Sequence, residues 1–124
     1  TDFSKFVGHL AAIICSGNTV IALLPENSSA LVSALGEVCA TSDLPKGVVN
    51  LLTGKLDELY PHFASHLEIQ SLSYQGQSPA ILTQLQIEGA ENMKRVIPEV
   101  TELLSLDHLL RFVEYKTVWH PMGT

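Results

Sequence analysis

The sequence predicts an α/β domain in which a parallel β-sheet lies between two layers of helices. Short apolar runs, several of them rich in Val and Ile, alternate along the chain with longer segments of helical periodicity. Strands separated by helical patterns of about 10–15 residues are typical of βαβ units, which build parallel sheets. Right-handed crossover connections then place helices on both faces of the sheet, which gives three layers.

The first unit consists of a helix and a strand. Residues 3–15 carry apolar side chains at helical spacing, and Gly17 ends that helix. Residues 19–24 form a short apolar run, β-branched at its start, which fits a strand buried in a parallel sheet. Pro25 follows directly, so we expect the strand to end there.

The second unit repeats this order. Ser28 or Ser29 can act as the N-cap of a helix. The apolar side chains of that helix recur at helical spacing and are Leu31, Ala34, Leu35 and Val38. Residues 44–47 contain Pro and Gly and predict a turn. Residues 48–52 are predicted to form a second buried strand, which Gly54 ends.

The following units are less regular. Residues 56–64 have the pattern of a third helix, which Pro61 interrupts. Residues 67–74 alternate apolar and polar side chains with a slip of one residue, and this alternation favours a strand. Residues 80–87 fit either a fourth helix or a strand, because several of them are β-branched. Residues 93–97 predict another short strand.

A C-terminal tail follows the alternating part of the chain. Residues 103–110 have a helical pattern, and the segment from Phe112 to Trp119 predicts a final strand. One face of that strand would carry Val113, Tyr115, Thr117 and Trp119. We therefore divide the chain into a first domain, residues 1–102, and a C-terminal helix and strand, residues 103–124.

The composition limits the classes of function. Hydrophobic residues make up 46% of the chain and charged residues 16%, which argues for a globular core and against disorder. The formal net charge is −6, and Lys94 and Arg95 form the one basic pair, which is assigned to the surface, so a nucleic-acid partner is not expected. No apolar run reaches the roughly 20 residues that a membrane helix needs.

No metal site is expected from the cysteines or the histidines. Cys15 and Cys39 lie in apolar helical patterns, away from any zinc-ligand spacing, and we expect both to be small buried hydrophobes. The histidines share no metal-ligand spacing and are assigned to surface or capping positions; they are His9, His62, His66, His108 and His120. Nothing demands an oxidising compartment, so a cytoplasmic location is the expectation.

One longer motif identifies a family. Residues 17–21 read GNTVI, Glu26 and Ser28 follow, and residues 44–54 read LPKGVVNLLTG. This stretch resembles the nucleotide-binding segment of aldehyde dehydrogenases, which typically reads GNTVVLKPAE and, after a helix, LPPGVVNVVTG. The spacing from Glu26 to Gly47 fits the family without a gap.

Shorter motifs extend the resemblance. Residues 64–66 match the family's ASH, residues 74–77 lie where it has FTGS, and residues 92–96 resemble its NLKRV. Residues 114–118 resemble EVKTV, the C-terminal strand that belongs to the oligomerisation element of these enzymes. The resemblance implies a Rossmann-like domain for NAD(P) and an oligomerisation tail, so the partner expected through the tail is a second copy or a catalytic dehydrogenase domain.

The resemblance implies three cofactor-binding residues. Glu26 matches the glutamate that binds the adenosine ribose, because a carboxylate accepts hydrogen bonds from two ribose hydroxyls. Gly54 matches the first glycine of a GFG turn, and Gly76 matches the glycine of FTGS.

Other cofactor positions depart from the family. Leu23 replaces a lysine that acts at the same ribose, Leu56 replaces the second glycine of GFG, and Gln77 replaces the serine of FTGS. Ile81 replaces a glycine, and a β-branched side chain there would block close approach of a helix to the pyrophosphate. We therefore expect no cofactor, with weak NAD(P) binding as the alternative.

The catalytic pattern departs further. Glu99 matches the family's general base, but Thr101 and Glu102 replace the two glycines that follow it. In the family the catalytic domain, with its nucleophilic cysteine, lies between this glutamate and the tail strand, and here residues 100–111 occupy that interval. A general base has no role without a nucleophile or water to activate. The family's PWN motif, which supplies the oxyanion-hole asparagine, would precede Thr1.

Three functions are compatible with these observations. The first is a non-catalytic aldehyde dehydrogenase-like domain, or pseudoenzyme, that acts in assembly or interaction and has a degenerate dinucleotide site. The second is a cofactor-binding segment of an active NAD(P)-dependent aldehyde dehydrogenase whose catalytic part lies outside this sequence. The third, and least favoured, is an independent nucleotide-binding regulatory module. We do not expect the chain to oxidise aldehydes by itself.

Overall fold

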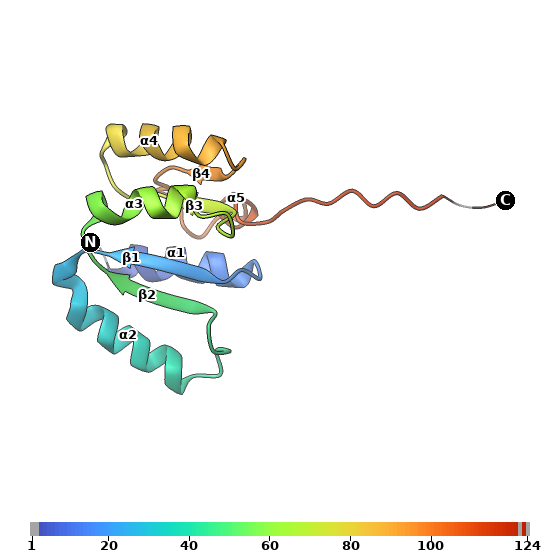
Figure 1. Cartoon of the computed structure of the whole chain (residues 1–124). Helices are drawn as coiled ribbons and strands as arrows, with labels where there is room; N and C mark the ends of the chain where they lie inside the picture. Colours follow the sequence, from blue (N-terminus) through green and yellow to red (C-terminus); the bar gives the residue numbers. More distant parts are fainter. Residues whose placement is uncertain (1–2, 122, 124) are drawn as a thin grey trace.

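The computed structural model describes residues 3–121 and residue 123, and it is an α/β fold (Figure 1). The helices and strands follow one another as α1 (Phe3–Cys15), β1 (Val20–Leu24), the 3-10 turn η1 (Glu26–Ser28), α2 (Ser29–Thr41), β2 (Val49–Thr53), α3 (Leu56–Ser65), β3 (Ser71–Ser73), α4 (Pro79–Ala90), β4 (Arg95–Ile97) and α5 (Leu106–Leu110). The predicted alternation of helices and strands is therefore confirmed.

The strands are parallel, as predicted, but they form two pairs instead of one continuous sheet. Strand β1 pairs with β2 from Val20 opposite Val49, and β3 pairs with β4 with Leu72 opposite Val96. In the part of the chain that the structure describes, no hydrogen-bonded ladder joins the two pairs. The prediction of a single three-layer sheet is thus supported only in its coarser form, as parallel strands between helices.

The shortness of β3 is one reason for this division. Residues 67–74 were predicted as one strand, yet the chain turns after α3 and only Ser71–Ser73 is a strand. The ammonium of Lys94 donates hydrogen bonds to the carbonyl oxygens of His66 and Ile69 in that turn. Those carbonyls therefore point to a side chain instead of a neighbouring strand.

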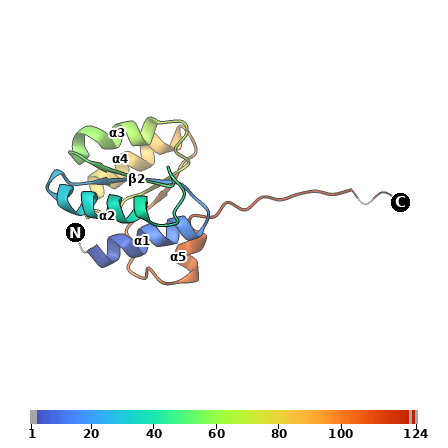
Figure 2. The ribbon, with the colours of Figure 1, turned by 90° about the horizontal axis from the view of Figure 1, so that it is seen from below.

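Helices cover both sides of the strands. Seen from below, α3 and α4 lie on one side of the strands, and α1, α2 and α5 lie on the other (Figure 2). This arrangement agrees with right-handed βαβ connections on both sides of β1. Strands β1 and β2 are nevertheless less buried than predicted, because Ile21 and Leu52 keep 47% and 46% of their surface exposed.

The structure forms a continuous helix at both of the less regular helical segments, residues 80–87 and residues 56–64. Residues 79–90 form the helix α4, with Pro79 in its first turn. Proline is tolerated there because an N–H in the first turn has no hydrogen-bond acceptor within the helix. Helix α3 runs without a break through Pro61 to Ser65. The predicted interruption at Pro61 is therefore wrong. Tyr60 and Phe63, on either side of the proline, both pack against the core, and this packing stabilises the helix.

The predicted tail strand is not formed. Residues 113–121 have no strand assignment and extend away from the body of the protein in both views (Figures 1 and 2). A β-strand requires a neighbouring strand to which its backbone is hydrogen-bonded, and among the described residues no strand pairs with this segment. Among the described residues, the tail also does not add to the edge of either strand pair of its own chain.

The core consists of two clusters. Residues from α3, β3 and α4 form the first, centred on Ala64, Leu72, Tyr74 and Leu85. The second joins Ala12 of α1 to Ile97 at the end of β4 and to Phe112 after α5. Helix α1 therefore packs against elements of both strand pairs, since it also contacts β1.

Candidate functional site

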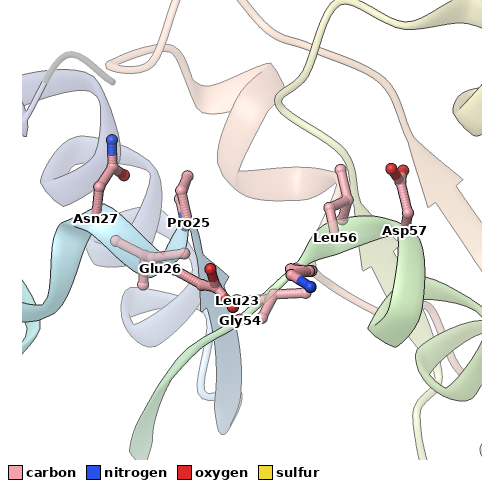
Figure 3. A pocket seen from close by; sticks show the side chains of 9 residues that line it. Leu23, Pro25, Glu26, Asn27, Gly54, Leu56 and Asp57 are labelled. Carbon is pink, nitrogen blue, oxygen red and sulfur yellow. The ribbon is translucent and has the colours of Figure 1, made fainter.

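An open hollow lies where β1 and β2 end. Parallel strands present their carboxyl ends at the same edge of a sheet, which is where ligands bind in open α/β folds. The hollow has a volume of about 510 Å³ and is lined by Leu23, Leu24, Pro25, Glu26, Asn27, Gly54, Lys55, Leu56 and Asp57. Figure 3 shows Glu26 and Asn27 on one side, Leu56 and Asp57 on the other, and Leu23 and Gly54 between them.

The charges around the hollow are mostly negative. Glu26, the first residue of η1, is exposed, and Asp57 in the first turn of α3 is a second carboxylate. Among the described residues that line the hollow, Lys55 alone carries an ammonium, which lies 3.2 Å from a carboxylate oxygen of Glu58. Leu23 contributes only hydrocarbon. This lining suits hydroxyl donors, whereas it repels the phosphates of a dinucleotide.

Gly54 has a packing role that does not involve a ligand. Its amide N–H donates to the carbonyl oxygen of Leu24 at 3.0 Å, which extends the pairing of β1 and β2. A Cβ atom at this position would lie 2.5 Å from the terminal Cδ1 of Leu59. The glycine therefore allows α3 to approach the end of β2 closely.

Gly76 is separated from this hollow. It follows β3, and a Cβ atom there would collide with the phenol oxygen of Tyr74. The same oxygen accepts a 3.4 Å hydrogen bond from the backbone N–H of Ser78, which precedes α4. The buried phenol thus occupies the space at the start of α4, where the fold would otherwise offer free N–H groups to a phosphate.

The predicted site residues are therefore brought together only in part. Glu26 and Gly54 line one hollow, together with Leu23 and Leu56, the first two of the departures from the family. Glu99 is exposed in the loop after β4 and does not line that hollow.

A buried polar cluster was missed by the sequence analysis. His9 Nδ1 lies 3.1 Å from His108 Nε2, and His9 Nε2 lies 2.8 Å from the hydroxyl of Ser73. The assignment of both histidines to surface or capping positions is wrong, since His9 is 8% and His108 1% exposed. His9 follows Phe6 by three residues, so helical spacing places both on one face, and this was the available signal.

Ser73, His9 and His108 are arranged like a nucleophilic serine, a general base and a group that orients the base, but the pKa values of the histidines are unsuited to catalysis. Burial, and then the neighbouring His108, lower the pKa of His9 to about 4, which makes it a weak base near neutral pH. Burial, and then Arg111, also lower the pKa of His108. The Ser73 hydroxyl in addition accepts a 2.8 Å hydrogen bond from the amide of Gln75. We interpret the cluster as structural.

Two further sequence expectations need correction. Lys94, taken as part of a surface pair, is buried at 8% exposure, while its neighbour Arg95 is exposed. The cysteines, expected to be buried, are free thiols, with Cys15 exposed and Cys39 half-buried. Cys15 is exposed although Ala12, three residues earlier in α1, is buried, because Cys15 is the last residue of the helix.

Metal and membrane features are also absent from the described residues. No group of three or more His, Cys, Asp or Glu side chains is placed to hold a metal ion among residues 3–121. Over the same part of the chain, no helix has the length and apolar character needed to cross a membrane.

Comparison with known proteins agrees with the motifs. The profile of the aldehyde dehydrogenase family matches residues 3–101. Retinal dehydrogenase 2 of Mus musculus is 28% identical over 95 residues, which cover 77% of this chain and 18% of that protein. Malonate-semialdehyde dehydrogenase 2 of Bacillus anthracis is 33% identical over 85 residues, which cover 68% of this chain and 17% of that protein. No solved structure matches the chain.

The chain thus spans less than a fifth of the length of either relative. The family profile covers α1 to β4 and all the residues that line the hollow. On this evidence the chain belongs to the aldehyde dehydrogenase family.

Proposed function

We propose that this chain is a non-catalytic member of its family that acts in assembly, with a degenerate dinucleotide site. The proposal keeps residues 1–102 as the nucleotide-binding-type domain and residues 103–124 as the assembly element. The free thiols Cys15 and Cys39 agree with a cytoplasmic location.

The observation that carries the proposal is the exposed, unpaired tail. Tyr115, Val118 and Trp119 expose 79%, 69% and 87% of their surface, on an extended segment that leaves the body of the protein (Figure 1). An extended apolar segment gains stability when it pairs with a sheet edge and buries these side chains. The partner that we propose is a second copy of the chain.

Removal of the tail tests this function. Deletion of residues 114–124 retains the buried Phe112 and the 2.7 Å hydrogen bond from Arg95 to the Val113 carbonyl oxygen. We expect the intact chain to be an oligomer and the truncated chain a monomer, as measured by light scattering during gel filtration. A control that lacks only residues 120–124 keeps the apolar segment and should remain an oligomer.

The assembly proposal is abandoned if the intact chain is already a monomer at about 100 µM, a concentration at which even a weak dimer of about 10 µM dissociation constant would be populated. It is also abandoned if the truncated chain keeps the mass of the intact chain.

A second candidate function rests on Glu26. Its exposed carboxylate lies beside Gly54 at the carboxyl ends of two parallel strands, where the family binds its ribose. This placement favours a cofactor-binding segment of an active NAD(P)-dependent enzyme with its catalytic part elsewhere. Measured dinucleotide binding separates the two candidates.

A further inference from the structure

The buried polar cluster joins three elements that are distant in the sequence. His9 of α1 lies between the other two: its Nε2 is 2.8 Å from the hydroxyl of Ser73 in β3, and its Nδ1 is 3.1 Å from Nε2 of His108 in α5. Phe112 packs edge-on against both imidazole rings, with ring centroids 5.4 Å from His9 and 5.3 Å from His108. This cluster attaches α5, and the start of the tail, to the body of the domain.

The hydrogen bonds allow one protonation state. The Nδ1 atom of His108 is buried and has no hydrogen-bond partner in the described structure. A bare nitrogen there costs less than a buried N–H without an acceptor, so the proton of His108 belongs on Nε2. Nε2 then donates to His9 Nδ1, and His9 in turn donates from Nε2 to the Ser73 hydroxyl.

An added proton breaks this chain of hydrogen bonds wherever it binds. A proton on His9 Nδ1 would face the N–H of His108 at 3.1 Å. If His108 then moved its own proton to Nδ1, a buried N–H would lack an acceptor. A proton added directly to His108 has the same consequence. The folded arrangement is therefore compatible only with two neutral rings.

Among the described residues, no carboxylate acts on the pKa of either imidazole. Ser73 is the side chain that β3 contributes, and it is uncharged. The charged groups on the surrounding elements are Lys5 of α1, Arg95 of β4, Glu99 and Glu102 of the next loop, and Asp107 and Arg111 of α5. Of these, Arg111 acts on His108, and its positive charge disfavours protonation. His108 has the same effect on His9.

We propose that His9 and His108 form a proton-sensitive latch, in which uptake of one proton releases α5 and Phe112 from α1. Release leaves each ring free to be solvated, and it detaches the start of the tail from the second core cluster. This inference does not depend on the proposed assembly function, because it concerns the attachment of α5 within one chain.

The pH range of release follows from the direction of the shift. The latched rings have lowered pKa values, about 4 for His9, whereas a released ring titrates near the ordinary 6.5. Both forms are neutral above pH 6.5, so pH has no effect there. As the pH falls below 6.5, only the released form binds protons, so release is favoured progressively down to about pH 4.

Hydrogen exchange at α5 tests the latch. The backbone N–H groups of Leu109, Phe112 and Val113 are hydrogen-bonded within this segment, and those of Val20 and Gly54 report on the first strand pair. We expect the protection factors of the α5 group, corrected for intrinsic exchange, to fall on the order of tenfold from pH 6.5 to pH 5. Those of Val20 and Gly54 should fall less.

Variants assign the effect to the two rings. The double variant His9→Leu, His108→Leu has no titratable ring at the cluster and should show pH-independent protection of α5. The control His62→Leu alters an exposed histidine of α3 and should behave like the parent chain. A double variant that loses protection over the same pH range as the parent chain would overturn the proposal.

The parent chain also supplies a readout that does not depend on whether the variant folds. Imidazole 15N shifts should show both rings neutral, with the proton on Nε2, at pH 7.5. The rings should take up protons only together with the loss of α5 protection. Protonation of either ring while α5 keeps its protection would contradict the latch.

Discussion

Lys94 illustrates how a charged side chain is held in the interior of this domain. Its ammonium is one of the few buried polar groups, and it donates hydrogen bonds to two carbonyl oxygens, those of His66 and Ile69. A buried cation is tolerated when backbone dipoles replace the lost water. The Lys94 side chain, just before β4, thereby fixes the turn between α3 and β3.

Replacement of Lys94 by Met tests this role. The variant keeps the apolar stem but leaves two carbonyl oxygens without their charged donor, so we expect the free energy of unfolding to fall by about 1–3 kcal/mol. Urea unfolding monitored by circular dichroism measures the change. The matched variant Lys46→Met, at an exposed turn position, should change stability by less than about 0.5 kcal/mol. Equal effects of the two variants would contradict the role of Lys94.

Among the elements, the connection from α2 to β2 depends on a turn with one left-handed residue. Gly47 has a φ of +83°, a backbone conformation that residues other than glycine rarely adopt. The N–H of Val48 closes the turn by donating a hydrogen bond to the Pro45 carbonyl oxygen. Gly36 differs, because it lies inside the helix α2, where a Cβ atom would have no neighbouring atom within 4 Å. The two glycines thus have opposite requirements.

A pair of alanine substitutions separates these requirements. Gly36→Ala should raise the free energy of unfolding by about 0.5–1 kcal/mol, since alanine favours the helix and the space is open. Gly47→Ala should lower it by about 1–2 kcal/mol, although no neighbour is crowded, because the left-handed backbone is strained. Thermal and urea unfolding measure both. A stabilising Gly47→Ala would show that the turn has another conformation.

Across the molecule as a whole, the break between the two strand pairs affects the candidate site. Glu26 and Gly54 belong to the first pair, whereas Gly76 and the start of α4 belong to the second. A dinucleotide needs its ribose and pyrophosphate contacts in one continuous arrangement. Here Tyr74 fills the space beside Gly76, and the hollow at Glu26 lacks a free cation among the described residues.

We therefore expect weak or absent dinucleotide binding. NAD at 1 mM, which is about tenfold above a 0.1 mM dissociation constant, would stabilise a working site by more than about 1 kcal/mol, a rise of several degrees in melting temperature. We expect almost no rise by differential scanning fluorimetry. A rise that Glu26→Ala abolishes, and that Glu37→Ala on α2 leaves intact, would instead favour the segment of an active enzyme.

Local sequence patterns were sufficient to predict the order and type of most elements. Helical periodicity in α1 and α2, the apolar runs of β1 and β2, and the turn at Gly47 are local signals, because each depends on residues close together in the chain. The family motif is local in the same sense, and it placed Glu26 and Gly54 at neighbouring strand ends.

Contacts between distant parts of the chain determine which polar residues are buried and which strands pair. His9 and His108 are 99 residues apart, and Lys94 reaches carbonyl groups 25 and 28 residues away, so no local pattern reveals their burial. The segment after Phe112 has strand-like alternation, but no strand pairs with its described residues, and a β-strand forms only beside another strand. Periodicity states which face of a segment is apolar, whereas hydrogen-bonded partners far along the chain determine what that face meets.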